Sequence, residues 1–380
     1  MIKNGKKTCS GCTACKHICP TSAIEMRSDD EGFQYPVINK EKCISCGKCE
    51  GICSFTDNYI IENNYTISEV YAVNGGGIDV SPKSSSAGVG NILANAFIKE
   101  GGIVYGAAFN DEFEVQHQRI ASLEEIEKIN GSKYVQSNLG NVFFNIQNDL
   151  LDGQKVLFFG TACQTAGLYS YISSKKLTDN LYLCDILCHG VPSPGVYKDY
   201  LNYMVHKNNC QIEKVIFRSK ENGWKSSLAG QCLTFKNGKK VNMSLFSKLY
   251  FTHLILRPSC CDCKYTTLNK PSDLTIADFW KIKDFEPSMY TPHGVSMVLM
   301  NSDKGRFLFH LLSKKMNTKQ MDLSCCTAKQ FKEPATVNEK RDLFFSYYKT
   351  KGANAVFRKY NRIFFFEQCR NRISKILKKS

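Results

Sequence analysis

Two runs of cysteine near the N-terminus have a spacing that could hold iron. Each run reads C-x2-C-x2-C-x3-C. The first consists of Cys9, Cys12, Cys15 and Cys19, and the second of Cys43, Cys46, Cys49 and Cys53. Tetrahedral zinc needs only paired C-x2-C units, so the third cysteine of each run is surplus to a zinc site. A four-iron cubane uses that third thiolate, and the runs therefore predict two [4Fe-4S] clusters rather than zinc or a disulfide knot.

The fourth cysteine of each run has a separate role. In two-cluster ferredoxins it ligates the other cluster. We therefore expect one cluster on Cys9, Cys12, Cys15 and Cys53, and the second on Cys43, Cys46, Cys49 and Cys19. Between the runs, residues 33–38 (FQYPVI) predict a short apolar strand that covers the clusters. A module of this kind transfers electrons and leaves the chemistry of the remaining chain open.

A second group of cysteines lies far downstream and could also do redox chemistry. It consists of Cys163, Cys184, Cys188, Cys260, Cys261 and Cys263, in which Cys260 and Cys263 form a C-x2-C pair. A third iron–sulfur site or a redox-active pair is one interpretation. Buried free thiols are an equal alternative, because reduced cysteine packs as a small hydrophobic residue. Cys210, Cys232, Cys325, Cys326 and Cys369 have no metal spacing and are predicted to be inert.

Two turns rich in small residues could hold phosphate. Residues 83–88 (KSSSAG) precede a predicted helix, so their amides and hydroxyls face a helix N-terminus. Residues 160–164 (GTACQ) follow a predicted strand, at the sheet edge where ligands usually bind. Neither matches a dinucleotide-binding or Walker motif, so each is either a cofactor loop or an ordinary turn. His189 is likewise either a general acid or substrate ligand, or a turn histidine bonded to its own backbone.

The composition limits the class of protein. Of 380 residues, 43% are hydrophobic, so the chain can form a substantial core and is not disordered. Residues 1–8 carry no apolar segment, which argues against export and predicts a cytoplasmic protein with reduced cysteines. The longest uncharged run, 156–174, contains glycine, serine, threonine and glutamine. We expect it to form a strand, a turn and a helix rather than a transmembrane segment.

Positive charge is in excess, and part of it is concentrated at the C-terminal end. The formal net charge is +15. Each thiolate-ligated four-iron cluster carries about −2, so two clusters lower it to about +11. No nucleic-acid recognition motif accompanies the basic residues, and nucleic acid is not an expected partner. Residues 341–380 predict either an amphipathic helix that meets an anionic membrane or a partner, or, preferably, a helix docked on its own domain.

Alternating strand and helix patterns must position these residues. Strands are predicted at 70–73, 102–109, 155–159, 181–187, 215–218, 274–276 and 295–300, with a hairpin at Asn237 and Gly238. Helices are predicted at 88–99, 139–151, 164–172 and 193–206. A capping box of Ser122 and Glu125 predicts another helix, up to residue 129. This order predicts an α/β core with antiparallel additions, joined to an α+β ferredoxin-like dicluster module by a polar linker at 54–68.

Seven blocks of the chain occur in an order that resembles a known family. They are KSSSAGVGNILANAFIKEGGIVYGAAF (83–109), GSKYVQSNLG (131–140), GTACQTAGL (160–168), DILCHGVPSP (185–194), FRSKENGW (217–224), RPSCCDCKY (257–265) and DLTIADFW (273–280). Together they resemble the beta-subunit family of coenzyme F420 hydrogenases and dehydrogenases. That family includes 7-hydroxymethyl chlorophyll a reductase and members with an N-terminal double-cluster ferredoxin domain. Family members commonly read S-G-G, G-T-P-C-Q and G-D-F-W where this chain has Ala87, Ala162 and Ala277.

The resemblance implies FAD beside the clusters, and therefore an α/β flavin-binding core. Ser84, Ser85, Ser86 and Gly88 would hold the FAD diphosphate; Lys133, Tyr134 and Ser137 would contact the flavin; and Thr161 and Gln164 would line the neighbouring turn. Cys163, Cys188, Cys260 and Cys263 lie in the family's cysteine-bearing blocks, which allows a third cluster. The implied domains are a dicluster domain at 1–58, the two parts of the family core at 68–150 and 151–330, and a basic helical tail at 331–380.

These features predict an iron–sulfur flavoprotein oxidoreductase. Electrons would pass between a ferredoxin-like or other one-electron carrier, the two clusters, FAD and an unknown organic substrate near His189, the candidate catalytic residue. One alternative is a coenzyme F420H2 oxidoreductase that feeds a partner subunit. An alternative of another class is a non-catalytic electron-transfer subunit that docks a partner enzyme. The flavin-side blocks disfavour this last alternative, because a simple ferredoxin subunit would not need them.

Overall fold

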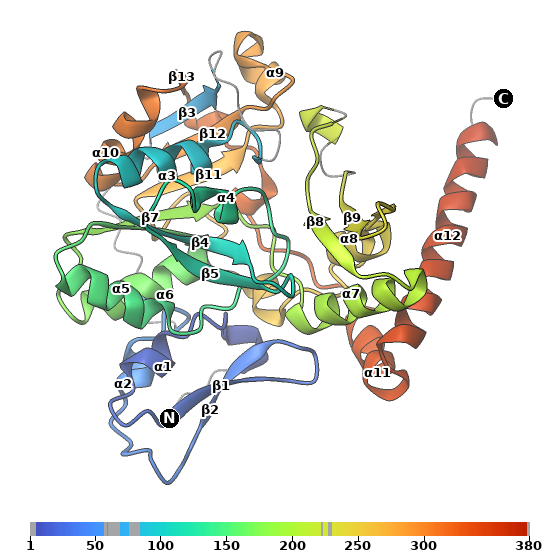
Figure 1. Ribbon diagram of the computed structural model, residues 1–380, viewed down its shortest axis with the longest axis horizontal. Coiled ribbons are helices and arrows are strands. Elements are labelled where there is room, and N and C mark those ends of the chain that lie inside the picture. Colours follow the sequence, from blue (N-terminus) through green and yellow to red (C-terminus); the bar gives the residue numbers. More distant parts are fainter. Residues whose placement is uncertain are drawn as a thin grey trace.

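The computed structural model describes residues 5–56, 59, 69–75, 84–221, 223–226 and 230–377, without the side chains of 368 and 371–377. The described residues form three parts: an N-terminal module, a central sheet with helices on both faces, and a lobe of helices around a small sheet (Figure 1). Most of the linker predicted at 54–68 lies outside the described residues, as does Lys83 of the serine-rich turn.

The N-terminal module contains two short helices and one hairpin. α1 (Ala14–Ile18) and α2 (Lys48–Gly51) each begin inside a cysteine run. The residues before them, Thr13 and Gly47, have φ of 68° and 72°, so each run turns sharply ahead of its helix. β1 (Ile24–Ser28) pairs antiparallel with β2 (Gln34–Ile38). The strand predicted at 33–38 and the α+β character of the module are thus confirmed.

The central sheet has eight strands in the order β13-β3-β12-β11-β7-β6-β4-β5. The strands are β3 (Glu69–Asn74), β4 (Ile103–Phe109), β5 (Val115–Ile120), β6 (Val156–Thr161), β7 (Leu181–Ile186), β11 (Leu274–Asp278), β12 (Ser296–Met300) and β13 (Asn317–Met321). β11, β7, β6 and β4 run parallel, and the strands on both sides of them pair antiparallel. The predicted α/β core with antiparallel additions is confirmed. Because parallel strands end at one edge, residues that follow β6 and β7 come close together.

Helices cover both faces of this sheet. α3 (Val89–Lys99), α4 (Ile126–Ile129) and α10 (Asp303–Ser313) pack on one face, and α9 (Ile282–Phe285) follows β11. α5 (Val142–Leu151) and α6 (Ala162–Ser173) pack on the other face, between the sheet and the N-terminal module (Figure 1). Ala14 and Ile52 of the module are buried in the same cluster as the apolar side chains of α5 and α6. The module therefore shares a hydrophobic core with the central domain.

The capping box predicted at Ser122 and Glu125 is wrong. α4 begins at Ile126 without a side-chain cap. The Glu125 carboxylate instead accepts the backbone N–H of Ala121 (3.1 Å), and its other oxygen pairs with Lys128 (2.8 Å). A capping box is found at α6, where Thr161 and Gln164 satisfy each other's backbone N–H groups.

The uncharged run at 156–174 divides between β6 and α6, as predicted. No helix within the described residues combines the length and the apolar character that crossing a bilayer requires.

The helical lobe surrounds a three-stranded sheet of order β10-β9-β8. Its elements are α7 (Pro194–Asn208), β8 (Ile212–Ile216), β9 (Cys232–Phe235), β10 (Lys240–Asn242), α8 (Ser244–Phe251), α11 (Arg341–Lys351) and α12 (Ala353–Leu377). β9 and β10 confirm the hairpin predicted at Asn237 and Gly238. Pro194 occupies the first turn of α7, as predicted.

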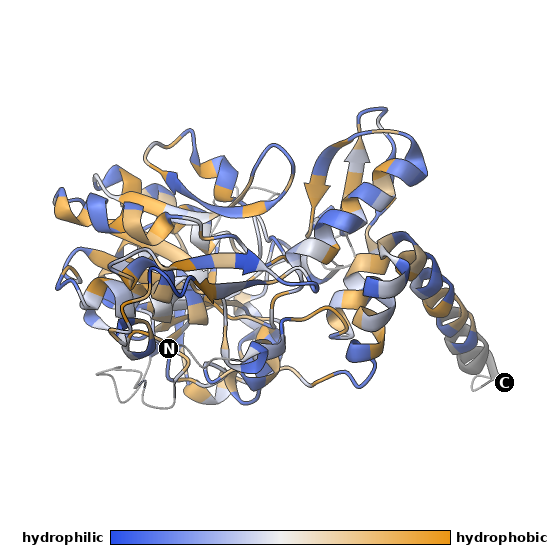
Figure 2. Cartoon of the chain, turned by 90° about the horizontal axis from the view of Figure 1, so that it is seen from below, coloured by the Kyte–Doolittle hydropathy of each residue, from blue (hydrophilic) through white to orange (hydrophobic). Residues whose placement is uncertain are grey.

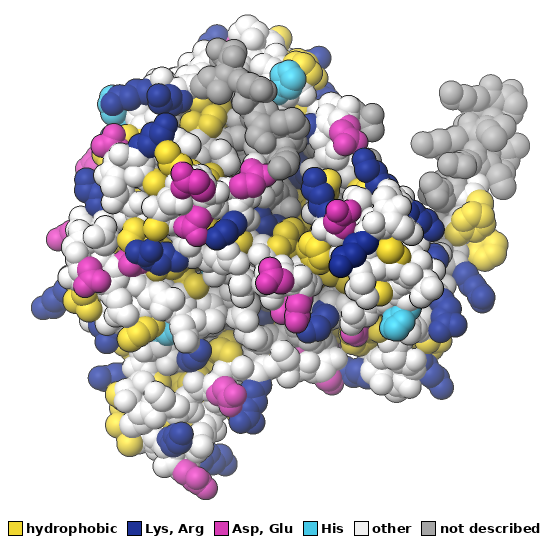
Figure 3. Space-filling model, viewed as in Figure 1, with side chains coloured by type: hydrophobic (Ala, Val, Ile, Leu, Met, Phe, Trp, Pro, Cys, Tyr) yellow, Lys and Arg dark blue, Asp and Glu magenta, His cyan; other side chains and the backbone are white. Residues whose placement is uncertain are grey.

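The C-terminal tail docks on this lobe. Phe344, Phe345 and Phe357 are buried in one cluster with the apolar side chains of α7 and α8, which confirms docking on the chain's own domain for this part of the tail. Further along, α12 extends away from the body and alternates polar and apolar residues along its length (Figure 2). Phe365 and Phe366 are 60% and 69% exposed. Exposed hydrophobic side chains lie next to Lys and Arg toward the outer end of this helix (Figure 3).

Candidate functional site

A small cavity in the N-terminal module is lined by sulfur. Cys9, Cys12, Cys15 and Cys53 all face it, as does Cys49, and apolar residues close its other sides. The structure therefore brings Cys53 of the second run to the first three cysteines of the first run, which is the exchange that the spacing predicts. The four sulfurs surround one space, as the ligands of a cubane must.

The surroundings of these thiols suit a cluster ligand. Burial raises the pKa of Cys12 to about 12, and the neighbouring thiols of Cys53 and Cys9 add to the effect. Burial likewise raises the pKa of Cys15. Thiolates that repel one another in a buried space need a positive charge among them, and iron supplies it.

The other predicted set lies nearer to the surface. Cys19, Cys43 and Cys49 are half-buried, and Cys46 is exposed. Despite slight burial, the pKa of Cys19 is lowered by hydrogen bonds, among them one from the Ala23 N–H at 3.2 Å. Hydrogen bonds to ligating sulfurs are one means by which proteins set cluster potentials.

The arrangement of cysteines suits a cluster better than a single ion. Within the described ranges, no three His, Cys, Asp or Glu side chains gather closely enough to share one metal ion. In a cubane each thiolate binds its own iron at a separate corner, so the sulfurs need not converge on one point.

The downstream cysteines meet at the carboxyl edge of the central sheet. Cys163 lies in the first turn of α6 after β6, and Cys188 follows β7. Cys260 lies in the short helix Pro258–Asp262, and Cys263 is the residue that follows this helix. All four line one partly open cavity of about 100 Å³, together with His189. The four cysteines singled out by the family resemblance are therefore brought together.

Two cysteines of the downstream group lie outside the lining of this cavity. Cys184 is fully buried in the core of the sheet, and burial raises its pKa well above the usual range. Burial also raises the pKa of Cys261, while the nearby Arg341 opposes the rise. The structure thus separates the six cysteines into four that share a cavity and two that pack elsewhere.

The four cavity thiols resemble those of the N-terminal module in their surroundings. Burial raises the pKa of Cys188 to about 12 and that of Cys263 to about 11, with Cys163 contributing to both. Their sulfurs also receive hydrogen bonds: from the Gly190 N–H to Cys188 (3.3 Å) and from the Val191 N–H to Cys260 (3.4 Å). The hydrogen bonds to two sulfurs suit the ligands of a third cluster, whereas burial raises the pKa of a free thiol in the same way, as it does at Cys184.

The two groups of cysteines approach each other across the domain junction. The thiol of Cys163 is among the groups that raise the pKa of Cys12, which places the two sulfurs within electrostatic range. α6 carries Gly167 toward the module, and a Cβ atom at Gly167 would lie only 2.7 Å from the Cys12 sulfur. The helix that holds Cys163 is therefore in direct contact with the cysteine run of the N-terminal module.

The serine-rich turn precedes α3 at the same edge of the sheet. Ser84 and Ser86 are buried, and the hydroxyl of Ser85 lies 2.6 Å from that of Ser132. The Ser86 hydroxyl donates to the carbonyl of Val295 (2.7 Å). Gly88 adopts φ of 75° directly before α3, a conformation that glycine takes without strain. The turn thus ends where the free N–H groups of an eleven-residue helix begin.

Cations gather around this turn. The Lys220 ammonium donates to the carbonyl of Ser86, and Lys133 adjoins Ser132, the partner of Ser85. Burial lowers the pKa of both lysines to about 8, and the nearby Arg218 lowers that of Lys220 further. Lys133 was predicted from the family resemblance. Lys220 was missed, because it lies far along the chain in the FRSKENGW block and nothing in its spacing marks it.

The remaining flavin candidates are joined in a hydrogen-bond network. The Gln164 amide donates to the Ser137 hydroxyl (2.9 Å), which also contacts Nδ1 of His117 (2.9 Å). Thr161 donates to Gln164 from its backbone N–H (3.0 Å) and its hydroxyl (3.1 Å). Tyr134 packs against other aromatic rings, with Tyr250 stacked at 5.6 Å. Thr161, Gln164 and Ser137 hold the turn at 160–164 in place. The contact of these residues and of Tyr134 with a flavin stays a prediction.

His189 is fixed by two side chains from elsewhere. Its Nε2 lies 2.9 Å from Nε2 of His253, and its Nδ1 lies 3.1 Å from the Gln330 amide. Nδ1 of His253 faces the carbonyl of Thr336 (2.7 Å), which can only accept, so His253 carries its proton there and accepts from His189. The alternative of a turn histidine bonded to its own backbone is wrong. Burial lowers the pKa of His189, which stays neutral.

Two segments of the chain match known protein families. Residues 8–56 match the 4Fe-4S dicluster domain, and residues 153–324 match the family described as the C terminus of the coenzyme F420 hydrogenase/dehydrogenase beta subunit. The resemblance drawn from the sequence is confirmed for these residues. No curated protein matches the chain.

Among the solved structures that match the chain is one that overlaps only loosely with its fold. It is a chain of the xenon-derivatised F420-reducing [NiFe] hydrogenase complex from Methanosarcina barkeri, which is 15% identical and has a TM-score of 0.46. The overlap covers 76% of the present chain and 89% of the other. The two family matches together describe an iron–sulfur electron-transfer protein related to F420 hydrogenase and dehydrogenase beta subunits.

Proposed function

We propose that this iron–sulfur protein is a flavin-dependent oxidoreductase that moves electrons between a one-electron carrier and an organic substrate. Electrons would enter or leave at the N-terminal module and reach the central domain across the contact between Cys12 and α6. Bound clusters transfer one electron at a time, whereas a bound flavin also exchanges electron pairs with organic molecules. In this proposal, side chains of the present chain bind the clusters and the flavin and hold them in position.

One observation carries the proposal: two sets of cysteines meet at α6, and a cationic serine turn lies at the same edge of the sheet as the downstream set. α6 contacts the N-terminal cysteines through Gly167 and bears Cys163 in its first turn. The strand before it ends next to Gln164 and Ser137. A protein that only passed electrons to a partner would need the cysteines, but it would not need buried lysines beside a serine turn.

The proposed ligands of the N-terminal clusters are those given by the spacing. Cys9, Cys12, Cys15 and Cys53 would hold one cluster, and Cys43, Cys46, Cys49 and Cys19 the other. Cys163, Cys188, Cys260 and Cys263 would hold a third, supported by their shared cavity and by hydrogen bonds to two of their sulfurs. The exposure of Cys46 favours the second cluster as the one nearest to an external carrier.

FAD is proposed at the serine turn. Ser84, Ser85, Ser86 and Gly88 would bind its diphosphate at the N-terminus of α3, where backbone N–H groups favour anions. Lys133 and Lys220 would supply the positive charge, because both adjoin this turn and neither is in an ion pair among the described residues. His189, kept neutral by burial and held in place by His253 and Gln330, would orient an organic substrate or exchange a proton with it.

Measuring iron, acid-labile sulfide and released flavin per chain after anaerobic purification tests the proposal. About eight irons with one FAD would support the enzyme on two clusters, and about twelve would support the third. Cys263→Ala should then lower about twelve irons to about eight, whereas Cys184→Ala, outside the cavity, should leave the iron content unchanged. Eight irons without flavin, and no flavin regained on adding FAD, would contradict the enzyme and favour a non-catalytic electron-transfer subunit.

The alternative of a coenzyme F420H2 oxidoreductase subunit rests on the family match alone. Its direct test is anaerobic oxidation of F420H2 by the protein loaded with iron and FAD, followed by the return of F420 absorbance. Turnover with F420H2 would favour this alternative and imply a partner subunit that receives the electrons. Reduction by a ferredoxin with no response to F420H2 would favour the primary proposal.

A further inference from the structure

One buried arginine lies between the two groups of cysteines. Arg257 is 1% exposed, directly before the short helix that carries Cys260. It lines the downstream cavity, and its guanidinium reaches back to the N-terminal cysteine run. Nothing in its sequence context predicts a role for it.

The partners of this guanidinium carry no negative charge. Nε donates to the carbonyl of Cys9 (2.7 Å), Nη2 to the carbonyl of Gln34 (2.9 Å) and Nη1 to the Gln136 side-chain oxygen (3.0 Å). The ring of Tyr35 lies against its face, with 4.3 Å between the guanidinium carbon and the ring centroid. Each of the three guanidinium nitrogens thus donates to a neutral acceptor, and none of these groups neutralises the charge.

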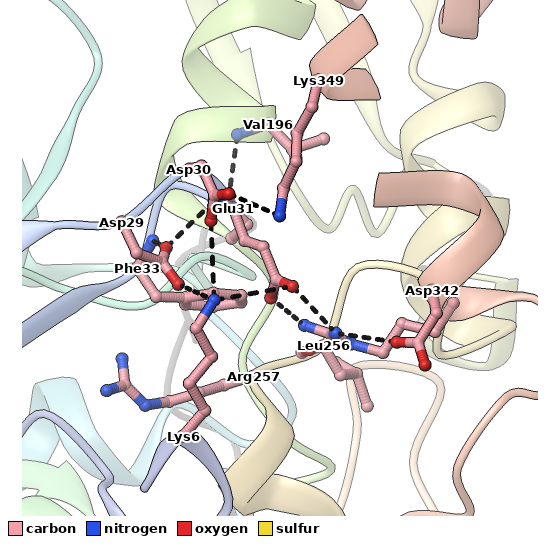
Figure 4. A network of polar contacts seen from close by, with 12 residues as sticks. Lys6, Asp29, Asp30, Glu31, Phe33, Val196, Leu256, Arg257, Asp342 and Lys349 are labelled. Carbon is pink, nitrogen blue, oxygen red and sulfur yellow. Dashed lines mark hydrogen bonds and ion pairs between the residues drawn. The ribbon is translucent and has the colours of Figure 1, made fainter. Parts of the chain in front are cut away.

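Carboxylates are near, but they bind other cations. Asp29 pairs with Lys6 (2.6 Å), Asp30 with Lys349 (2.5 Å) and Glu31 with Arg341 (2.6 Å). Figure 4 shows these pairs turned away from the Arg257 guanidinium. In the part of the chain that the structure describes, Arg257 has no carboxylate within ion-pair distance. A fully buried cation without a counter-charge is costly, so a negative group must lie near it when the protein is complete.

The nearest sulfur of the proposed clusters supplies a position for that charge. Nη2 of Arg257 lies 3.8 Å from the sulfur of Cys9. The cysteine loop also closes around the guanidinium, since a Cβ atom at Gly11 would lie 3.0 Å from Nη1. A four-iron cluster with four thiolates carries about −2, and gains one more negative charge on reduction.

We propose that Arg257 is the counter-charge of the cluster held by Cys9, Cys12, Cys15 and Cys53, and that it raises the reduction potential of that cluster. The attraction between the guanidinium and the cluster grows when an electron is added, so the reduced form gains more than the oxidised form. Burial excludes the water that would otherwise screen this effect. The inference rests on the proposed assignment of these four cysteines to one cluster.

An anaerobic redox titration of the iron-loaded chain, followed by electron paramagnetic resonance, tests the inference. In Arg257→Gln one of the two N-terminal clusters should become harder to reduce. We expect at least a tenfold lower ratio of reduced to oxidised cluster at a fixed potential, which for one electron corresponds to about 59 mV. The cluster on Cys43, Cys46, Cys49 and Cys19 should keep its potential. Arg257→Lys retains the charge and should recover most of the difference.

A second variant tests the charge without removing the arginine. Gln136→Glu places a carboxylate on Nη1, and by neutralising the guanidinium it should shift the same cluster in the same direction as Arg257→Gln. This variant replaces Arg257→Gln if the latter fails to take up iron. The double variant Glu31→Gln, Arg341→Gln is the matched control, because it removes a buried, neutral ion pair at the same domain junction. It should leave both potentials unchanged.

The outcomes separate this inference from the proposed function. Wild-type protein that takes up no iron and gives no signal on reduction would overturn the cluster assignment itself. Loaded variants with wild-type potentials would overturn only the role of Arg257. Equal shifts in Arg257→Gln and Arg257→Lys would also overturn it, because they would show that geometry rather than charge sets the potential.

Discussion

At the scale of single residues, Gly167 of α6 lies directly against the sulfur of Cys12 in the N-terminal module. Alanine in place of a helical glycine ordinarily stabilises a helix by roughly 0.5–1 kcal/mol. At Gly167 the added Cβ would lie 2.7 Å from the Cys12 sulfur, which cannot move freely while it binds iron. We therefore expect Gly167→Ala to take up less iron and to melt at a lower temperature than wild type.

Gly90 offers the matched control for this prediction. It also lies in a helix, but a Cβ atom there would meet only the side chains of Ile276 at 3.6 Å and Phe159 at 3.9 Å, both ordinary contacts. Gly90→Ala should keep the full iron content and an equal or slightly higher melting temperature. A Gly167→Ala protein with full iron content and raised stability would show that the two domains do not approach this closely.

Lys133 and Lys220 make flavin binding depend on pH. Burial lowers the pKa of both to about 8, with Arg218 also acting on Lys220. Below about pH 8 both ammonium groups are charged and attract the diphosphate, and above it they lose their protons. We expect FAD affinity, measured by equilibrium dialysis, to fall at least tenfold from pH 7 to pH 9.5, because the loss of even one of the two charge-assisted hydrogen bonds costs about 1.5 kcal/mol or more.

The same lysines affect the apoprotein in the opposite direction. Their pKa values rise on unfolding, so the unfolded chain binds more protons between about pH 8 and pH 10.5, and their contribution to stability increases with pH. Replacing both by arginine keeps the charge at high pH and should flatten the affinity profile. A wild-type affinity that does not change across this range would argue against a diphosphate at the serine turn.

At the scale of elements, the loop between β1 and β2 joins the N-terminal module to the rest of the chain. A Cβ atom at Gly32 would lie 2.5 Å from the Cα atom of Gly195 in α7, so the two backbones touch. The Ser193 hydroxyl, which caps α7, donates to the carbonyl of Glu31 (2.5 Å). The Glu31 carboxylate pairs with Arg341 at the start of α11. Three elements distant in sequence therefore meet at this one loop.

Replacing one partner of the ion pair at this loop should destabilise the protein strongly. Replacing both partners should cost less free energy of unfolding than the two single losses added together. Both side chains are 9% exposed, and loss of one partner leaves a buried charge unpaired. We expect Glu31→Gln or Arg341→Gln alone to lower the free energy of unfolding by about 3 kcal/mol. The double variant should lose less than the sum of the two. Denaturant unfolding measures the three values, and additive losses would contradict a coupled pair.

The elements with regular patterns were the ones that the sequence could predict. β3, β4, β6, β7, β11 and β12 follow from short apolar runs, and α7 from its periodicity and Pro194. β5 and β13 were missed because consecutive polar residues, QHQR within β5 and TKQ within β13, leave neither an apolar run nor an alternating pattern, and each strand pairs on one side only. The capping box was assigned to Ser122 rather than Thr161, because both sites carry a suitable residue and only packing selects between them.

The residues of the candidate site also fall into those that the sequence could predict and those that it could not. Cysteine spacing predicted that Cys9, Cys12, Cys15 and Cys53 share one cavity, because the first three lie close together in sequence and two-cluster ferredoxins exchange the fourth ligand. Arg257, Lys220 and His253 left no such signal. Each reaches the site through a hydrogen bond or close contact that spans more than 60 residues, to Cys9, Ser86 and His189 respectively. Tertiary structure decides such contacts, and a single sequence does not encode them in any local pattern.

At the scale of the whole molecule, the C-terminal tail forms part of the hydrophobic core of the helical lobe. Phe344 and Phe345 of α11 and Val356 and Phe357 of α12 share one buried cluster with α7, α8 and β9. The same lobe contacts the N-terminal module through Gly195 and Arg341. The position of the module on the central domain therefore depends on a segment that lies at the other end of the chain.

Two truncations separate the buried part of α12 from its exposed end. A chain that ends after residue 351 lacks Val356, Phe357, Tyr360 and Phe364, all buried. Loss of a large buried side chain typically costs roughly 3–5 kcal/mol, so four exceed what the lobe can sustain, and we expect an aggregating or partly unfolded protein. A chain that ends after residue 364 loses no described residue that is buried, and should melt at the wild-type temperature with full iron content.

If both truncated chains melted like the wild type, α12 would not belong to the core. If the longer one also unfolded, the exposed end would stabilise the lobe through contacts with other molecules, such as a second copy, and its melting temperature would then depend on protein concentration.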